Sequence, residues 1–217
     1  MYFQSRAEAG VMLAADLTKY RYENTVVLAL SDGAVQLGMQ IAAEIHATLA
    51  LMLSERIDVP GEGEFYGMVD QKGQLVPNTL LSEGQRDEYY SEYHGFFEEQ
   101  KREQSSRLNK LLSSGGVVSE SMLREQNVVL LSDGLKDPGM LEVAVNYMKP
   151  LKILRLIVAT PVASVPAVDR AHVLADELHI LSITNNFLDV NHYYEVNDTP
   201  SHEETIQMLN DFVLRWR

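Results

Sequence analysis

The sequence predicts an α/β fold built on a doubly wound, mostly parallel β-sheet. Along the 217 residues, short runs of β-branched and other apolar residues alternate with segments in which apolar residues recur every three or four positions. The first pattern is typical of strands buried on both faces, and the second of amphipathic helices. Their alternation favours parallel strands joined by helical crossovers. A third observation supports the same fold, because one strand-to-helix corner, at residues 128–144, is repeated at residues 26–42.

The repeated corner consists of an apolar run, then Ser-Asp-Gly, four further residues and Gly-Met. In open α/β sheets, ligands bind beyond the carboxyl ends of the strands, where the N-terminus of the next helix attracts anions. We therefore expect a ligand site shared by the two corners. The alternative is that the two units look alike only because turns favour Asp and Gly. The matching residues are Ser31, Asp32, Gly33, Gly38 and Met39 in the first corner and Ser132, Asp133, Gly134, Gly139 and Met140 in the second.

Composition and charge narrow the class of protein. The length predicts one domain, residues 1–217, and a content of 46% hydrophobic and 23% charged residues is ordinary for a globular chain. No apolar run reaches the roughly 18 residues that a membrane helix needs. The chain lacks cysteine and a signal-peptide pattern, so we expect a cytoplasmic protein. A net charge of −13 argues against binding to nucleic acid or to a membrane surface.

The elements of the N-terminal half follow from local patterns. Helical spacing of apolar residues predicts helices, continuous apolar runs predict strands, and a Gln-Lys-Gly turn at residues 71–73 joins two short runs into a hairpin. The glycines at 61, 63 and 67 do not open a helix after a strand, so a dinucleotide-binding fingerprint is excluded. In order, we expect a helix at 3–20, a strand at 26–30, a helix at 38–53, a strand at 57–60 and the hairpin at 65–76.

Residues 82–112 are strongly charged and predict an amphipathic helix or pair of helices. Four aromatic residues here recur at three- and four-residue spacing, which favours packing or a dimer contact over the alternative of a base-stacking surface; they are Tyr89, Tyr93, Phe96 and Phe97. Serines and glycines at 113–116 end this segment. We expect the hairpin and this segment to form a flap, inserted at about residues 61–116.

The C-terminal half returns to alternating strands and helices. The tail begins Ser-His-Glu-Glu before an apolar-periodic pattern, which resembles a capping box. The six histidines show no close metal-ligand spacing, so no zinc site is predicted. The predicted elements are a strand at 128–131, a helix at 139–148, a strand at 153–159, a helix at 167–175, a strand at 177–183 and a helix at 201–216, the last within a C-terminal hood at about 184–217.

In this order, the motifs resemble those of type I phosphoribosyltransferases, in particular a bacterial, loosely annotated group. The chain opens like that group's F-x-x-R-x-x-A-G-x-x-L-A, with Phe3, Arg6, Ala9, Gly10, Leu13 and Ala14. A Pro-Gly segment, a strand end and a closing segment also match, at Pro60, Gly61, Glu64, Gly67 and Gly73, at Ala159, Thr160, Pro161, Val162 and Ala163, and at Tyr193, Tyr194, His202, Glu203 and Glu204. The resemblance covers nearly the whole chain and implies a phosphoribosyltransferase-type sheet.

The resemblance also implies a ligand and a site. Members of the family transfer a phosphoribosyl group from phosphoribosyl pyrophosphate to a nitrogenous base, commonly as homodimers, and Mg²⁺ can bridge ligand and protein. Two acids after an apolar strand hold the ribose hydroxyls, and a small hydroxylated turn cradles the 5′-phosphate. Here Asp133 matches the second acid, which makes it the candidate catalytic residue and Mg²⁺ contact. The phosphoribosyl loop comprises Ser132, Asp133, Gly134, Leu135, Lys136, Asp137, Pro138, Gly139 and Met140.

Both phosphate-binding loops depart from the family pattern. Ser132 replaces the first acid, Pro138 has no N–H to donate, and Asp137 places a negative charge where the phosphate would sit. Only Lys136 offers a replacement cation nearby. The usual basic pyrophosphate loop is replaced by Ser31, Asp32, Gly33 and Ala34, in which an acid stands where a cation is expected.

Two hypotheses for the function follow. Ser and Asp are strong N-cap residues, so each loop can satisfy its own backbone N–H groups instead of binding a phosphate. The first hypothesis is an enzyme that retains a phosphoribosyl site, in which Asp133 binds the ribose hydroxyls or Mg²⁺ and Lys136 binds the phosphate. The second is a non-catalytic binding or regulatory module of the same fold, with phosphoribosyl transfer weakened or lost.

Overall fold

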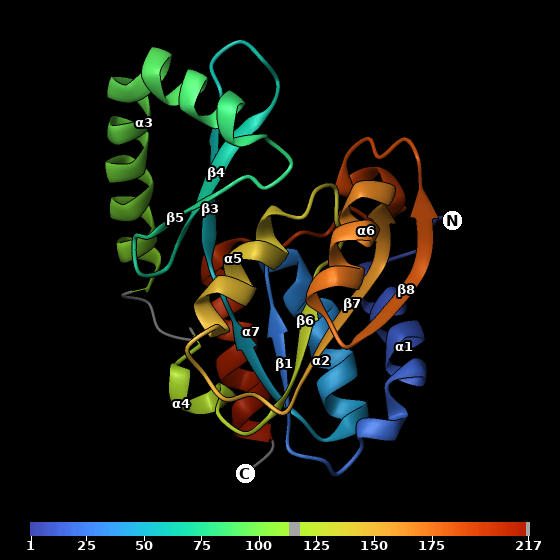
Figure 1. The fold of residues 1–217 in the computed structure, drawn as a ribbon. Helices are drawn as coiled ribbons and strands as arrows, with labels where there is room; N and C mark the ends of the chain where they lie inside the picture. The colour runs from blue at the N-terminus through green and yellow to red at the C-terminus, as the bar shows by residue number, and fades with distance from the viewer. Residues whose placement is uncertain (113–117, 216–217) are drawn as a thin grey trace.

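A five-stranded parallel sheet with the order β2-β1-β6-β7-β8 lies at the centre of the computed structural model, which describes residues 1–112 and 118–215 (Figure 1). Its strands are β1 Thr25–Ala29, β2 Thr48–Leu51, β6 Asn127–Leu131, β7 Arg155–Ser164 and β8 Glu177–Thr184. Every neighbouring pair is parallel. The predicted doubly wound α/β fold is confirmed.

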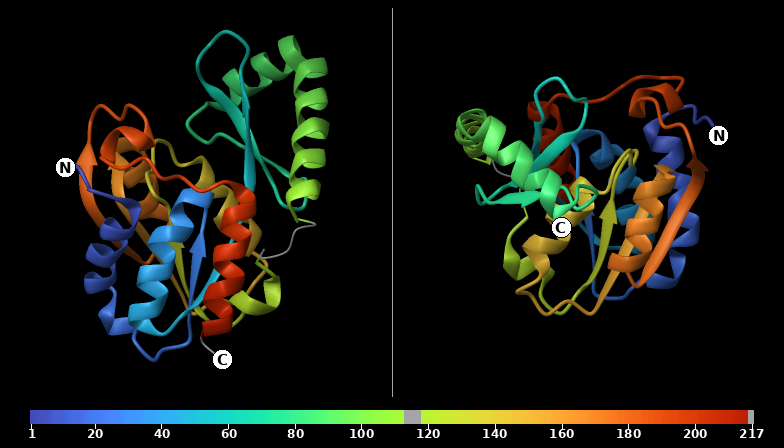
Figure 2. Two further views of the ribbon diagram at one scale, coloured as in Figure 1. Left: turned by 180° about the vertical axis from the view of Figure 1, so that it is seen from behind. Right: turned by 45° about the horizontal axis from the view of Figure 1, so that its top comes forward.

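Helices cover both faces of this sheet, as the opposite views in Figures 1 and 2 show. One face carries α1 Arg6–Asp16, α2 Asp32–Ile45 and α7 His202–Arg215, and the other carries α5 Gly139–Met148 and α6 Val165–Leu174. Short helices are η1 Thr18–Tyr20, α4 Glu120–Leu123 and η2 Val190–Tyr193. Each face has its own apolar core, because alternate residues of β1 and β6 point to opposite sides. None of the helices in the described ranges is long and apolar enough to cross a membrane.

The predicted helix at residues 38–53 was wrong at both ends. α2 begins at Asp32 and ends at Ile45, followed by His46 in the left-handed conformation, with φ +57°. Residues 48–51 then form β2, which pairs with β1. Their apolar pattern fits a buried helix turn or a buried strand equally well, and pairing with β1 decides between them. β7 also runs to Ser164, beyond the predicted end at 159, because β8 pairs along it.

The flap consists of a three-stranded antiparallel sheet and a long helix. It contains β3 Ser54–Asp58, β4 Phe65–Asp70, β5 Leu75–Pro77 and α3 Glu83–Leu112. The predicted hairpin is confirmed: Asp70 accepts hydrogen bonds from the backbone N–H groups of Lys72 and Gln74, and Gly73 takes a φ of +75°. β3 differs from the predicted strand at 57–60 and brings residues 54–58 into the flap sheet. The predicted break at 113–116 and Trp216 lie outside the described residues.

α3 bends at Tyr93, where the backbone leaves the helical region, in keeping with the predicted helix pair. The aromatic residues mainly pack within the flap. Phe97 is fully buried and stacks on Tyr66, with ring centroids 4.1 Å apart. Phe97 is therefore not available as a dimer contact, which corrects part of that prediction. Tyr89 and Tyr93 are half-buried, and the homodimer itself stays a prediction.

Glu177, at the start of β8, is expected to make stability depend on pH. Burial raises its pKa, but hydrogen bonds from Lys19, Tyr20 and His179 outweigh burial and lower the pKa from 4.5 to about 2. The stability that Glu177 contributes to the folded state is complete above about pH 4.5 and is lost as the pH falls towards 2. In urea unfolding, the Glu177→Gln variant should not show this part of the loss of stability at acidic pH. The exposed Glu195→Gln is the control, and equal pH slopes for Glu177→Gln and the wild type would contradict the expectation.

Candidate functional site

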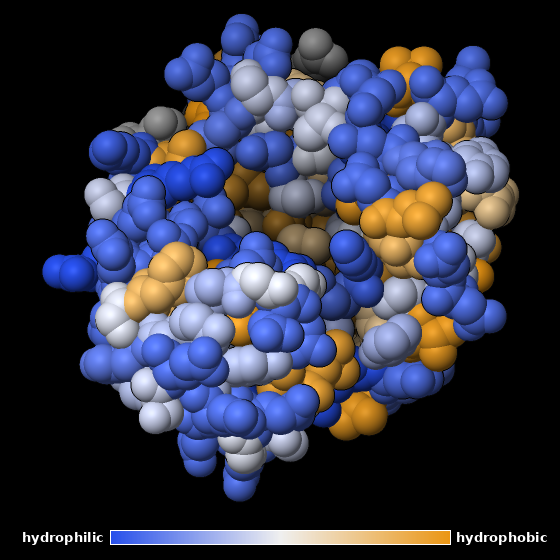
Figure 3. All heavy atoms as spheres, turned by 90° about the horizontal axis from the view of Figure 1, so that it is seen from above, coloured by the Kyte–Doolittle hydropathy of each residue, from blue (hydrophilic) through white to orange (hydrophobic). Residues whose placement is uncertain are grey.

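The two repeated corners meet between β1 and β6, where successive strands stop being added on one side of β1 and begin to be added on the other. From β1 the chain passes to β2 on one side, whereas β6 lies on the other side of β1. β1 and β6 pair in register, with Ala29 beside Leu131, so their following loops leave the sheet side by side. In open α/β sheets this switch point is the usual position of a ligand site. Figure 3 views the molecule from this side and shows a hollow with apolar atoms at its bottom.

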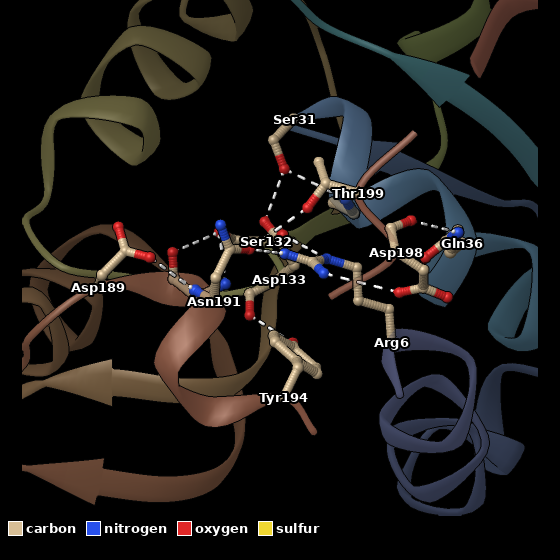
Figure 4. Close-up of polar contacts among 12 residues, drawn as sticks. Arg6, Ser31, Gln36, Ser132, Asp133, Asp189, Asn191, Tyr194, Asp198 and Thr199 are labelled. Carbon is tan, nitrogen blue, oxygen red and sulfur yellow. Dashed lines mark hydrogen bonds and ion pairs between the residues drawn. The ribbon is translucent and has the colours of Figure 1, made fainter. Parts of the chain in front are cut away.

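Asp133 and Ser31 join the two corners directly. Asp133 is buried, and its Oδ1 accepts a hydrogen bond of 2.8 Å from the Ser31 hydroxyl. Its Oδ2 accepts one of 2.9 Å from Nε of Arg6, the first residue of α1 (Figure 4). A side chain at Gly33 would collide with this pair, since an added Cβ would lie 2.2 Å from Oδ2 of Asp133. Both carboxylate oxygens are thus engaged by the protein itself.

Arg6 connects this carboxylate to the C-terminal segment. The arginine is 1% exposed, and its Nη2 donates a 2.6 Å hydrogen bond to Oδ1 of Asn191. Its Nη1 lies 3.7 Å from a carboxylate oxygen of Asp198, and its guanidinium stacks over the Tyr194 ring at 4.5 Å. The Tyr194 hydroxyl in turn donates to the backbone carbonyl of Asp133. Burial, and then the charge of Asp133, raises the pKa of Tyr194.

The roles of Arg6, Asn191 and Asp198 were not predicted from the sequence. In the sequence, Arg6 is recognisable only as one position of the opening motif that resembles the family's. A signal was present, because Arg6 falls on the apolar stripe of its helix with Phe3, Ala9 and Leu13. A charge on a stripe that must be buried needs a buried partner. The sequence gives no comparable signal for Asn191 or Asp198.

The phosphoribosyl loop closes on itself through its own side chains. The Ser132 hydroxyl is buried and both donates to the Gly134 carbonyl and accepts from the Gly134 N–H. Asp137 accepts the Gly139 N–H through Oδ1 at 3.0 Å and pairs through Oδ2 with Nη1 of Arg56 at 2.8 Å. Asp137 therefore satisfies one backbone N–H at the start of α5, although the N-cap residue itself, Pro138, makes no side-chain cap.

The remaining members of this loop are divided between the core and the surface. Leu135 is buried and bridges to Ala163 of β7, and Pro138 is buried just before α5. Met140 is half-buried, whereas Lys136 is exposed. At Gly139 the flap comes close, because an added Cβ would lie 2.7 Å from Sδ of Met68 in β4. The flap thus packs directly against the loop.

The pyrophosphate-type loop also caps itself, although not through the predicted acid. Ser31 is the N-cap of α2, and its hydroxyl accepts the Ala34 N–H at 3.1 Å. Asp32 instead contacts Nδ1 of His202, at the start of α7, at 3.0 Å. The acid that was expected to cap α2 therefore joins α2 to α7.

The residues around Asp133 do not fit a directly bound Mg²⁺. The ion prefers several oxygen ligands in an octahedral arrangement. Asp133 offers two oxygens, both of which accept hydrogen bonds, and the guanidinium of Arg6 already balances its charge. Within residues 1–112 and 118–215, no three histidine, aspartate or glutamate side chains gather closely enough to hold a metal.

The fold and the paired corners resemble those expected of a type I phosphoribosyltransferase. No protein-family model matches the chain. A curated protein of Mycobacterium tuberculosis H37Rv, described as a "putative phosphoribosyl transferase", is 22% identical over 213 residues, and so is its counterpart in strain CDC 1551 / Oshkosh. Each alignment covers 96% of this chain and 46% of that protein. This chain therefore spans about half the length of the curated relatives it matches.

Solved structures with a similar fold are also found. The crystal structure of TT1426 from Thermus thermophilus matches with a TM-score of 0.73 and 25% identity, covering 98% of this chain and 99% of that one. A hypoxanthine phosphoribosyltransferase from Staphylococcus aureus is a more distant match, with a TM-score of 0.48 and 13% identity over 85% of this chain and 77% of that one. The resemblance to phosphoribosyltransferases is confirmed by the curated relatives.

Proposed function

We propose that this chain is a phosphoribosyltransferase-fold binding module that does not transfer phosphoribosyl groups. The observation that carries the proposal is the buried ion pair between Arg6 and Asp133. Asp133 is the acid that matches the family's ribose-binding residue, and its two oxygens are occupied by Arg6 and Ser31. Each carboxylate oxygen can accept a second hydrogen bond, but Asp133 is buried, so a ribose hydroxyl would reach it only by moving Arg6 or Ser31 aside. Breaking a buried ion pair costs about 3 to 5 kcal/mol, which a single hydroxyl hydrogen bond does not return.

The phosphate position supports the same proposal. A 5′-phosphate on the loop would need the Gly139 N–H, to which Asp137 is bonded. The displaced carboxylate would remain close to the phosphate, and like charges at about 4 Å repel by roughly 1 kcal/mol in water and several times more in a partly buried site. Pairing with Arg56 offsets part of this repulsion, but it also engages the guanidinium that could otherwise bind the phosphate.

A weak phosphoribosyltransferase is the second candidate, and one observation favours it. The ammonium group of Lys136 has no hydrogen-bond or ion-pair partner among the described residues and is exposed at the loop. It is therefore available for a phosphate. In this alternative Lys136 binds the phosphate, and Asp133 exchanges Arg6 for the ribose hydroxyls.

Calorimetric titration with phosphoribosyl pyrophosphate and Mg²⁺ distinguishes the two candidates. We expect no binding in the micromolar range, because both loops are closed by their own side chains. Micromolar binding by the wild type that is lost in Lys136→Met would overturn the proposal in favour of the enzyme. The matched control is Lys149→Met, at the other end of α5, where the lysine is also exposed.

A further inference from the structure

A pocket of about 250 Å³ lies between the flap and the phosphoribosyl loop, away from the Arg6–Asp133 pair. Three segments form it: the β3–β4 region of the flap, the connection from β5 into α3, and the loop before α5. The lining residues that matter here are Arg56, Phe65, Leu80, Gln85, Lys136 and Asp137. The proposed function leaves this pocket without a role.

Two cations line the pocket, and only one of them is already paired. Arg56 is fixed by three contacts: its Nη1 with Asp137 at 2.8 Å, its Nε with Asp58, and its guanidinium over the Phe65 ring at 4.5 Å. This arrangement leaves Nη2 as its remaining donor group. The ammonium group of Lys136, in contrast, has no hydrogen-bond or ion-pair partner in the described part of the chain. A fixed guanidinium and a free ammonium together favour a ligand rich in acceptor oxygens.

The other walls are apolar or amide-bearing. Phe65 and Leu81 are buried at the pocket, and Leu80 is 53% exposed although it is apolar. Gln85 uses its carbonyl oxygen to accept from Ser82, so its amide nitrogen is the group left to donate. Apolar walls with a few fixed polar groups are typical of small-molecule sites.

The charge around the pocket limits the charge of its ligand. Arg56 and Lys136 are balanced within the lining by Asp137 and Glu64. A monoanion would pair with Lys136, whereas a dianion such as a phosphate monoester would bring a second negative charge close to these two carboxylates. The pocket therefore favours a carboxylate over a phosphate.

We infer that this pocket binds a small organic carboxylate with a flat apolar body, held by Lys136 and packed against Leu80. A water molecule takes about 30 Å³ of liquid volume, so a pocket of about 250 Å³ accommodates a molecule of about eight non-hydrogen atoms. The inference rests on the proposed function, because it supplies the ligand class of the binding module.

Three probes that share a phenyl ring test the inference. Benzoate is a flat monoanion, benzamide is its neutral counterpart, and phenyl phosphate is a dianion at neutral pH. We expect benzoate to bind with a sub-millimolar Kd by calorimetry or by chemical-shift titration, and to bind about tenfold more tightly than benzamide, which lacks the charge. Phenyl phosphate should bind more weakly than benzoate. No benzoate binding, or tighter binding of phenyl phosphate, would overturn the inference.

Two lysine variants locate the site. Lys136→Met keeps the length of the side chain and removes its charge, and it should weaken benzoate binding about tenfold or more. Lys149→Met should bind benzoate as the wild type does. Equal affinity in Lys136→Met and the wild type would place benzoate elsewhere and refute the site. Titration with phosphoribosyl pyrophosphate distinguishes failure of this inference from failure of the proposed function. Micromolar binding of phosphoribosyl pyrophosphate refutes the proposed function. The absence of benzoate binding alone refutes only the ligand class.

Discussion

Replacing Arg6 with Met should lower the free energy of unfolding by about 3 to 5 kcal/mol. Methionine fills much of the volume of the arginine side chain, but it leaves the carboxylate of Asp133 buried with no opposite charge beside it. The variant also removes the hydrogen bond to Asn191 and the stacking over Tyr194. Urea unfolding followed by circular dichroism measures the change.

Two comparisons make the interpretation specific. Arg21→Met removes an exposed pair with Glu44, whose side chains are 42% and 44% exposed, and should change stability by only about 0 to 1 kcal/mol. Adding Asp133→Asn to Arg6→Met should recover part of the loss, because the buried group is then neutral. A loss below about 1 kcal/mol for Arg6→Met would show that Asp133 reaches water or another cation, and the main support for a closed site would be lost.

Changing Asp32→Arg together with Asp137→Thr should improve the affinity for ribose 5-phosphate by about tenfold to a hundredfold. The first change supplies a cation at one corner, and the second removes a repulsive carboxylate at the other. Together they are worth about 1.5 to 3 kcal/mol, although Pro138 still denies the turn one N–H donor. The structure adds a further reason, since the loss of Asp137 leaves Arg56, beside the loop, with only one of its two carboxylate partners. Calorimetry against the wild type measures the gain.

The same double variant should be less stable. Asp137 accepts the N–H of Gly139, the first residue of α5, and losing such a hydrogen bond costs about 0.5 to 1.5 kcal/mol. Replacing Asp32 also removes its contact with His202. A control with the same change in charge, Asp211→Arg with Asp169→Thr, alters exposed residues. It should change neither the affinity for ribose 5-phosphate nor the stability by much. A double variant that binds no better and melts no lower would mean that these carboxylates neither block an anion nor stabilise the loops.

The sequence by itself determined the features that depend on neighbours in the chain. Alternating apolar runs and amphipathic patterns established the parallel sheet and its helices, and turn chemistry established the hairpin at residues 71–73. The capping box is present as expected: the Ser201 N–H donates to the Glu204 carboxylate at 2.8 Å, and the Ser201 hydroxyl accepts the Glu204 N–H. Each of these interactions joins residues a few positions apart, so local residue types suffice to specify it.

Only the tertiary structure decided the interactions that close the candidate site. Arg6 and Asp133 are 127 positions apart, and Asp32 and His202 are 170 apart, so no local pattern pairs them. Residues 48–51 likewise became a strand only because β1 offered an open edge for pairing. A buried charge must find a partner, but the sequence near Asp133 does not name it, because the partner is whichever opposite charge the whole fold brings within hydrogen-bond distance.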